Sequence, residues 1–188
     1  MATDTRELLL KETETLLRTR GYAAFSYADL AEKVGIRKAS IHHHFPTKEA
    51  LGAALIDSYL DDFRAALDAI LANEKSAIDR LNRYAAFFVS SMKDGMMPLC
   101  GALSAEAYVL PESLQVRVRG FFELHLEWLQ GVIREGKKAG ELRSDLKPKH
   151  TATLILSTLE GASLVAWAMK DPGAIKPAIA SVVRTIEA

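Results

Sequence analysis

Residues 26–36 read SYADLAEKVGI, and residues 37–45 continue with RKASIHHHF. The first run predicts a short helix that begins with a capping box, because Asp29 stands three residues after Ser26. Gly35 follows this helix, and glycine readily adopts the positive φ that a tight turn requires. The second run predicts another short helix. The two runs together therefore predict a helix-turn-helix.

The second of these helices has an apolar face and a polar face. Ile41 and Phe45 stand four residues apart, so they predict a face that packs against the first helix. In a helix-turn-helix, the exposed side of the second helix enters the major groove, where small and hydrogen-bonding side chains meet base edges. The side chains left exposed for this contact are Arg37, Lys38, Ala39, Ser40, His42 and His43.

The charge of this segment suits a DNA surface, although the whole chain is neutral. Its 188 residues carry 24 basic and 24 acidic side chains. Between Ile36 and Lys48, in contrast, there are three basic side chains, three histidines and no acid. Such a local patch can neutralise phosphates and supply affinity that does not depend on base sequence.

Residues 29–51 closely resemble the DNA-binding domain of the TetR family of transcriptional regulators. The ending HHFPTKEAL, at residues 43–51, is the most specific part of this resemblance, which covers the N-terminal quarter of the chain. The length of the chain, with a variable helical remainder, is also similar to that family. The resemblance implies that Ser40, His42 and His44 contact bases and phosphates, and that the protein acts as a repressor.

Lys48 begins the next predicted helix, and the resemblance implies that the N-terminus of this helix grips the DNA backbone. The helix dipole and its free N–H groups also favour a phosphate there on physical grounds. Ser26 completes the predicted DNA-binding set.

Two residues depart from the commonest family form: Arg37 stands where serine or threonine often caps the helix, and His42 stands where tyrosine is usual. Histidine there would make the phosphate contact shorter and sensitive to pH.

Helical periodicity continues through the rest of the chain. The first helix is expected to be capped by Thr3 or Asp4 and to end at Gly21, and Thr47 is expected to cap the helix that follows it. The remaining expected helices are Lys48–Leu71, Lys75–Lys93, Pro98–Tyr108, Glu112–Ala139, Lys147–Lys170 and Ala174–Ile186.

We therefore expect an all-α fold with two domains. An N-terminal three-helix helix-turn-helix DNA-binding domain is expected over residues 1–48, and a larger helical effector-binding and dimerisation bundle over residues 49–188. The N-terminus lacks the apolar stretch of a signal peptide, and the single cysteine, Cys100, suits a reducing compartment. These features predict a cytoplasmic protein.

The larger predicted domain has the composition of a ligand pocket. Aromatic and methionine side chains are spread over its apolar helices, with Glu106, His125 and Glu160 among them. Because ligand pockets are typically apolar with a few placed polar groups, we expect a small, mainly apolar effector to bind between these helices. The predicted effector-binding residues are Phe88, Met92, Met96, Cys100, Tyr108, Phe122, His125, Trp128, Glu160 and Trp167. For Cys100, a small buried hydrophobe is favoured over a sensor thiol.

The last two predicted helices, near residues 147–170 and 174–186, are apolar on most sides. A helix of this kind must be buried all round, so we expect these two to form the interface of a homodimer. Two recognition helices on one face of DNA then predict an inverted-repeat operator with half-sites about 34 Å apart. No membrane span is expected, because basic residues bracket a stretch that contains Glu160.

Two other classes of function stay open at this point. The chain could be an enzyme or a helical small-molecule-binding protein that uses the C-terminal pocket without binding DNA, or a helical adaptor. The sequence shows no phosphate-binding glycine loop and no nucleophile elbow, so no catalytic residue and no cofactor are expected. No metal is expected either, because three adjacent helical histidines point about 100° apart and cannot converge on one ion.

Overall fold

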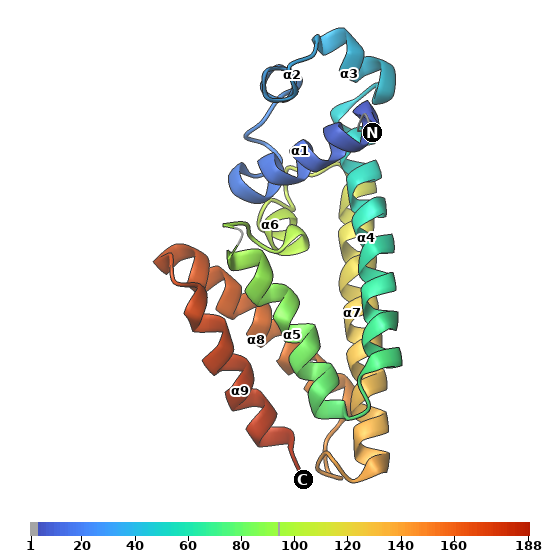
Figure 1. Cartoon of the computed structure of the whole chain (residues 1–188), viewed down its shortest axis with the longest axis vertical. Helices are drawn as coiled ribbons and strands as arrows, with labels where there is room; N and C mark the ends of the chain where they lie inside the picture. The colour runs from blue at the N-terminus through green and yellow to red at the C-terminus, as the bar shows by residue number, and fades with distance from the viewer. Residues whose placement is uncertain (1–3, 94) are drawn as a thin grey trace. The chain divides into compact units, whose positions relative to one another are not determined.

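The computed structural model describes residues 4–93 and 95–188, and this part of the chain is built from α-helices (Figure 1). They are α1 Thr5–Arg20, α2 Tyr27–Val34, α3 Lys38–His44, α4 Lys48–Asn73, α5 Ala77–Lys93, α6 Leu99–Ala105, α7 Glu112–Ala139, α8 Pro148–Met169 and α9 Ile175–Ile186. A 3-10 turn, η1, spans Pro172–Ala174. The prediction of an all-α fold is confirmed.

The predicted helix starts and stops match the structure in most places. Asp4 caps α1 by accepting the N–H of Arg6 at 3.1 Å, and Gly21 ends that helix with a φ of 95°. Thr47 Oγ1 accepts the N–H of Ala50 at 3.0 Å, which confirms it as the cap of α4. Thr3, the other predicted cap, lies outside the described residues.

The predicted end of α6 is wrong. The helix stops at Ala105 and does not reach Tyr108. After Ala105 the backbone forms tight turns, in which Ala107 N–H donates to the Ser104 carbonyl at 3.3 Å and Val109 N–H donates to the Glu106 carbonyl at 2.9 Å. These i to i+3 bonds replace the i to i+4 bonds of an α-helix.

The chain forms two compact units. Unit 1 contains the chain up to Asp62 together with residues 99–121, and unit 2 contains residues 63–98 and 122–188. The long helices α4 and α7 each contribute one part to each unit. The functional division expected between residues 48 and 49 stays a prediction.

Unit 1 joins the helix-turn-helix to α6 and to the beginnings of α4 and α7. Its fully buried side chains come from all of these elements and include Leu9, Leu30, Ile41, Leu51, Leu99 and Leu114. Gly52 lets α7 approach α4 closely, because a Cβ there would lie 2.9 Å from Leu114 Cδ1. Arg117 of α7 also pairs with Asp57 of α4 at 2.9 Å. Unit 1 is therefore more than an isolated helix-turn-helix.

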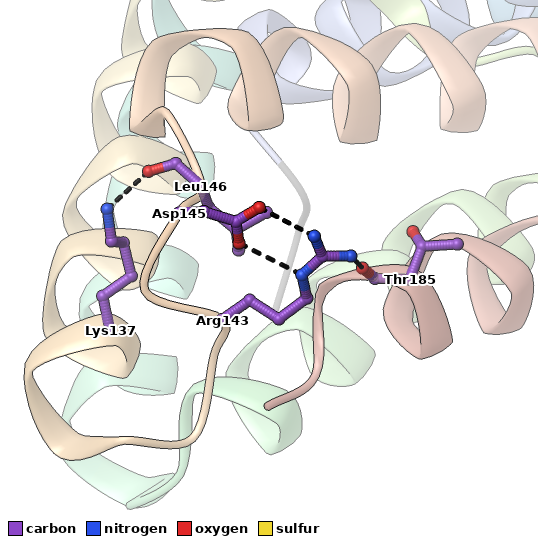
Figure 2. A network of polar contacts seen from close by, with 5 residues as sticks. All are labelled: Lys137, Arg143, Asp145, Leu146 and Thr185. Atoms are coloured by element: carbon purple, nitrogen blue, oxygen red, sulfur yellow. Dashed lines mark hydrogen bonds and ion pairs between the residues drawn. The ribbon is translucent and has the colours of Figure 1, made fainter.

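Unit 2 is a bundle in which α8 runs beside α9 and packs against α5 (Figure 1). Figure 2 shows how the α7–α8 connection is fastened to the end of α9. Lys137 donates to the Leu146 carbonyl at 2.5 Å, and Arg143 pairs with Asp145 at 2.7 Å. Arg143 also donates to the Thr185 carbonyl at 3.3 Å, which ties the connection to α9.

Among the described residues, α8 is the one helix that is long and apolar enough to cross a membrane. A third of its most apolar window is buried inside the structure. The helix carries Glu160 and lies against α5, α9 and η1, which makes it part of the helical bundle of unit 2.

Candidate DNA interface and buried polar cluster

The start of α2 has the predicted capping box. Ser26 Oγ accepts the N–H groups of Ala28 and Asp29 at 3.2 and 3.3 Å. The Asp29 carboxylate in turn accepts the Ser26 N–H at 2.7 Å and the Ser26 hydroxyl at 2.6 Å. These hydrogen bonds stabilise the ionised carboxylate and lower the pKa of Asp29. The cap fixes where α2 begins.

The two helices of the motif are locked together as expected. Gly35 adopts a left-handed conformation with a φ of 75°, and its N–H donates to the Ala31 carbonyl at 2.9 Å. Nothing lies within 4 Å of where its Cβ would be, so the backbone conformation and not the available space requires glycine. Tyr27 donates its hydroxyl to the Phe45 carbonyl at 2.9 Å, and Ile41 is completely buried.

The outward face of α3 holds most of the predicted DNA contacts. Arg37 stands at the N-cap of α3 and makes no side-chain hydrogen bond there, unlike the serine or threonine that is common at this position in the family. His44 is half-buried. The predicted residues that are exposed are Ser26, Arg37, Lys38, Ala39, Ser40, His42 and His43.

The ring of His42 is held by two neighbours. Its Nδ1 lies 3.1 Å from the Pro46 carbonyl oxygen, and its ring meets that of Tyr27 edge-on at a centroid distance of 4.9 Å. Because a carbonyl oxygen only accepts, Nδ1 must carry the proton in this hydrogen bond. Nε2 is then the ring nitrogen that remains for a contact outside the protein.

Lys48 has a different environment from the other predicted DNA-binding residues. Its ammonium donates to the carbonyls of Tyr22 and Phe25, each at 2.5 Å. It also lies over both aromatic rings, 4.5 Å from the centroid of Tyr22 and 4.3 Å from that of Phe25. Partial burial lowers the pKa of Lys48. The ammonium is therefore bonded within unit 1.

Glu106 binds the same segment as Lys48. Its carboxylate accepts the N–H groups of Tyr22 and Ala23, both at 2.8 Å. The sequence places Glu106 with His125 and Glu160 as polar groups of one pocket, whereas the structure uses its carboxylate within unit 1. These contacts join residues 84 and 83 positions apart, so no local pattern could have indicated them.

Unit 2 contains a buried cluster of aromatic and polar side chains. Tyr84 donates its hydroxyl to His125 Nδ1 at 2.5 Å. The His125 ring stacks on Phe63 at 4.4 Å, and the Tyr84 ring stacks on Trp128 at 5.2 Å. Phe88 meets the Tyr84 ring at a centroid distance of 5.6 Å. The cluster thus brings together three predicted effector residues, Phe88, His125 and Trp128.

Burial controls the charges in this cluster. It lowers the pKa of His125 to about 3, so the imidazole is neutral and accepts a hydrogen bond at Nδ1. Burial also raises the pKa of Glu160 to about 7, and it raises that of Tyr84, to which the charge of Glu160 adds. The indole Nε1 of Trp128 is buried and finds no hydrogen-bond partner among the described residues. The cluster therefore holds several polar groups in an apolar interior.

The other predicted effector residues are spread over both units. Met92 and Trp167 line a separate cavity of about 340 Å³ in unit 2, together with Lys170. Cys100 is buried in unit 1, and Tyr108, also in unit 1, is fully exposed. Met96 and Phe122 lie in unit 2 and are partly buried.

Sequence reasoning missed Tyr84 and Phe63, although they form the centre of the cluster. Tyr84 precedes the predicted Phe88 by one helical turn, so it was available as a candidate on the same helix face. Phe63 lies on a different helix, and its stacking on His125 depends on tertiary packing.

Two family models match the chain in succession. Residues 9–55 match "Bacterial regulatory proteins, tetR family", and residues 77–182 match "Tetracyclin repressor-like, C-terminal domain". The second match alone covers more than half of the chain.

Named relatives agree with these matches. The chain is 26% identical over 163 residues to the HTH-type transcriptional repressor DhaR of Mycobacterium sp. strain GP1, covering 86% of this chain and 82% of the relative. It is 31% identical over 148 residues to the nucleoid occlusion factor SlmA of Marinobacter nauticus, covering 78% and 73%. Other relatives are also named as repressors.

Solved structures have the same fold over nearly the whole chain. A TetR-family regulator from Agrobacterium tumefaciens has a TM-score of 0.93 and 31% identity, covering 97% of each chain. A TetR regulator from Legionella pneumophila has a TM-score of 0.88 and 31% identity, covering 99% of this chain and 100% of that one. The chain belongs to the TetR family, whose members are DNA-binding transcriptional regulators and not enzymes.

Proposed function

We propose that this chain is a homodimeric repressor that binds an inverted-repeat operator and is released by a small, mainly apolar effector. The α3 helix carries this proposal, because Ile41 is completely buried while its neighbours Ser40 and His42 are exposed. Residues 1–48 would bind DNA, and residues 49–188 would bind the effector and the second copy. The relatives that are named as repressors support the direction of regulation.

The DNA contacts fall into two kinds. Arg37 and Lys38 are exposed cations at the start of α3 and would bind phosphates, which supplies affinity without sequence preference. Ala39, Ser40 and His42 are small or hydrogen-bonding and would face base edges. The remaining members of the proposed set are Ser26, His43 and His44, whereas the ammonium of Lys48 is bonded within unit 1.

The second copy would cover α8 and α9. Leu154, Leu164, Val165 and Met169 on α8 are each about half exposed or more, which is unusual for four large apolar side chains on one helix. A two-fold pairing of α8 and α9 would bury them and form a four-helix interface. It would also place two copies of α3 on one face of DNA.

The effector would bind in unit 2. The cluster around Tyr84 and His125 and the cavity lined by Met92 and Trp167 combine apolar walls with a few polar groups. The Trp128 N–H is a buried donor that a ligand acceptor could bind. Phe88, Met96, Phe122 and Glu160 complete the proposed set in unit 2, whereas Cys100 and Tyr108 belong to unit 1.

A selection from random double-stranded DNA tests the proposal. The purified chain is expected to enrich an inverted repeat with a fixed spacer, because a two-fold dimer reads two half-sites. Ser40→Ala should change the enriched bases, and Lys75→Ala, which removes an exposed charge from unit 2, should leave them unchanged. Enrichment of single, unpaired sites by the wild-type chain would contradict the dimer, and no enrichment at low salt would contradict DNA reading.

A further inference from the structure

The loop between α1 and α2, residues 21–26, is bonded on two sides. On one side, the Glu106 carboxylate accepts two successive N–H groups, those of Tyr22 and Ala23, at 2.8 Å each. The carboxylate lies so close that a Cβ on Gly21 would be 1.9 Å from Glu106 Oε1. Hydrogen bonds to a charged group are roughly twice as strong as neutral ones, so this contact holds the loop firmly.

On the other side, Lys48 binds carbonyls of the same loop. Its ammonium donates to Tyr22 and Phe25 at 2.5 Å each and lies over both of their rings. Tyr22 is thus held by its N–H through Glu106 and by its carbonyl through Lys48. The two side chains come from the turn after α6 and from the first residue of α4.

We infer that Glu106 and Lys48 form a clasp on residues 21–26 that positions the recognition helix α3, and that Lys48 acts through this clasp and not by binding a phosphate. The inference rests on the proposed function, because positioning matters only if α3 reads DNA. Both residues are positioning residues, since neither would touch a base.

The clasp can orient α3 because residues 21–26 are joined to α2, and α2 is joined to α3, by hydrogen bonds. The loop leads directly into α2, whose first residue is fixed by the Ser26 capping box. The α2 helix is in turn locked to α3 through the Tyr27 hydroxyl, which donates to the Phe45 carbonyl at 2.9 Å. A shift of residues 21–26 would therefore move α2 and α3 together.

The internal bonds of its ammonium argue against a phosphate contact by Lys48. A phosphate would have to compete with two carbonyls at 2.5 Å and two aromatic rings. Lys38, in contrast, is exposed on α3. The two lysines thus form a matched pair, one turned into unit 1 and one exposed.

The salt dependence of operator binding separates the two roles of Lys48. Removing one phosphate-binding cation reduces the slope of log K against log salt by about 0.9, or by about 1.8 when it is removed from both copies of a dimer. Lys38→Ala should show this reduction. Lys48→Met keeps the aliphatic stem over the rings, and it should weaken operator binding about tenfold at every salt concentration with an unchanged slope.

Glu106→Gln tests the clasp because general electrostatics and loss of the clasp predict opposite changes in operator affinity. Removing a negative charge from the DNA-binding unit should strengthen binding to a polyanion if only general electrostatics matters. Loss of the clasp predicts the reverse, because an amide can accept only with its oxygen and would face one N–H with its own NH₂. We expect operator affinity to fall several-fold while affinity for a scrambled duplex does not fall. Glu112→Gln removes an exposed charge from α7 in unit 1 and serves as the matched control.

Each of the two variants has outcomes that contradict the clasp. A slope reduced by Lys48→Met, or operator affinity left unchanged by it, overturns the clasp. Tighter operator binding by Glu106→Gln also overturns it, as does an equal decrease in affinity for operator and scrambled DNA, which would indicate simple destabilisation. A wild-type chain that prefers no DNA sequence overturns the proposed function itself, whereas these variant results overturn the clasp alone.

Discussion

The Tyr84 hydroxyl lies 2.5 Å from His125 Nδ1 inside unit 2, where both side chains are almost completely buried. Tyr84 donates this hydrogen bond, since burial keeps His125 neutral and holds the pKa of Tyr84 well above its usual range. Two polar groups that would be costly to bury alone thus satisfy each other. Each member of this pair also stacks on another ring of the cluster: His125 on Phe63, and Tyr84 on Trp128.

Removing the Tyr84 hydroxyl should destabilise the protein. Tyr84→Phe keeps the ring that stacks on Trp128 but leaves His125 Nδ1 without its donor, so the free energy of unfolding should fall by about 1–3 kcal/mol. Urea unfolding followed by circular dichroism measures this free energy for the variant and the wild type. Tyr108→Phe, on a fully exposed ring in unit 1, is the matched control and should have no effect. Equal stability of Tyr84→Phe and the wild type would show that the hydrogen bond contributes nothing.

The contribution of Glu160 to stability should decrease as the pH rises. Its pKa is raised to about 7 in the folded chain from 4.5, so between these values the folded state binds the proton and the unfolded state does not. The stabilisation is therefore complete below pH 4.5 and is lost as the pH passes 7. His125 works in the opposite direction, because its pKa is lowered to about 3 from 6.5 and its stabilisation is lost as the pH falls.

A comparison with Glu160→Gln isolates this carboxyl from His125. The wild type minus variant difference in unfolding free energy should decrease steadily between pH 4.5 and 7 and level off above 7. Urea titrations at pH 5, 6, 7 and about 8 are sufficient. A difference that does not change with pH would mean that Glu160 is not held in a desolvated site.

Leu164 should be essential for dimer formation. It is 58% exposed on α8, and Leu164→Glu would place a charge in the proposed interface. We expect a monomer by gel filtration with light scattering and operator binding at least tenfold weaker, since one copy contacts only one half-site. Val116→Glu provides the control, because Val116 is similarly exposed, at 54%, but lies on α7 in unit 1. If the Leu164→Glu variant remained a dimer, the interface would have to lie elsewhere.

Local signals made most of the fold predictable. The Ser26 capping box, the positive φ of Gly35 and the cap at Thr47 each depend on residues within a few positions of one another. The predicted end of α6 is wrong because the apolar pattern of the sequence continues beyond the last helical hydrogen bond. There, tight turns follow Ala105 and the Glu106 carboxylate binds a loop more than 80 residues away.

The candidate sites show the same difference between signals from neighbouring residues and contacts between distant ones. The exposed face of α3 follows from the periodicity of a single helix, so Ser40 and His42 could be placed from the sequence. The inward direction of Lys48 and the Tyr84–His125 pair depend on contacts 26 and 41 residues apart. Sequence periodicity assigns a residue to a face of its helix, but the partner it meets there is determined by tertiary packing.

The central claim is that this chain distinguishes one DNA sequence from another, and a comparison of affinities tests it most directly. The purified wild type is titrated at physiological salt with the selected inverted repeat, with the same duplex after one half-site is scrambled, and with a fully scrambled duplex. We predict that the intact repeat binds at least about a thousandfold more tightly than fully scrambled DNA, and that scrambling one half-site removes most of this advantage. Equal affinities for all three duplexes would contradict the account.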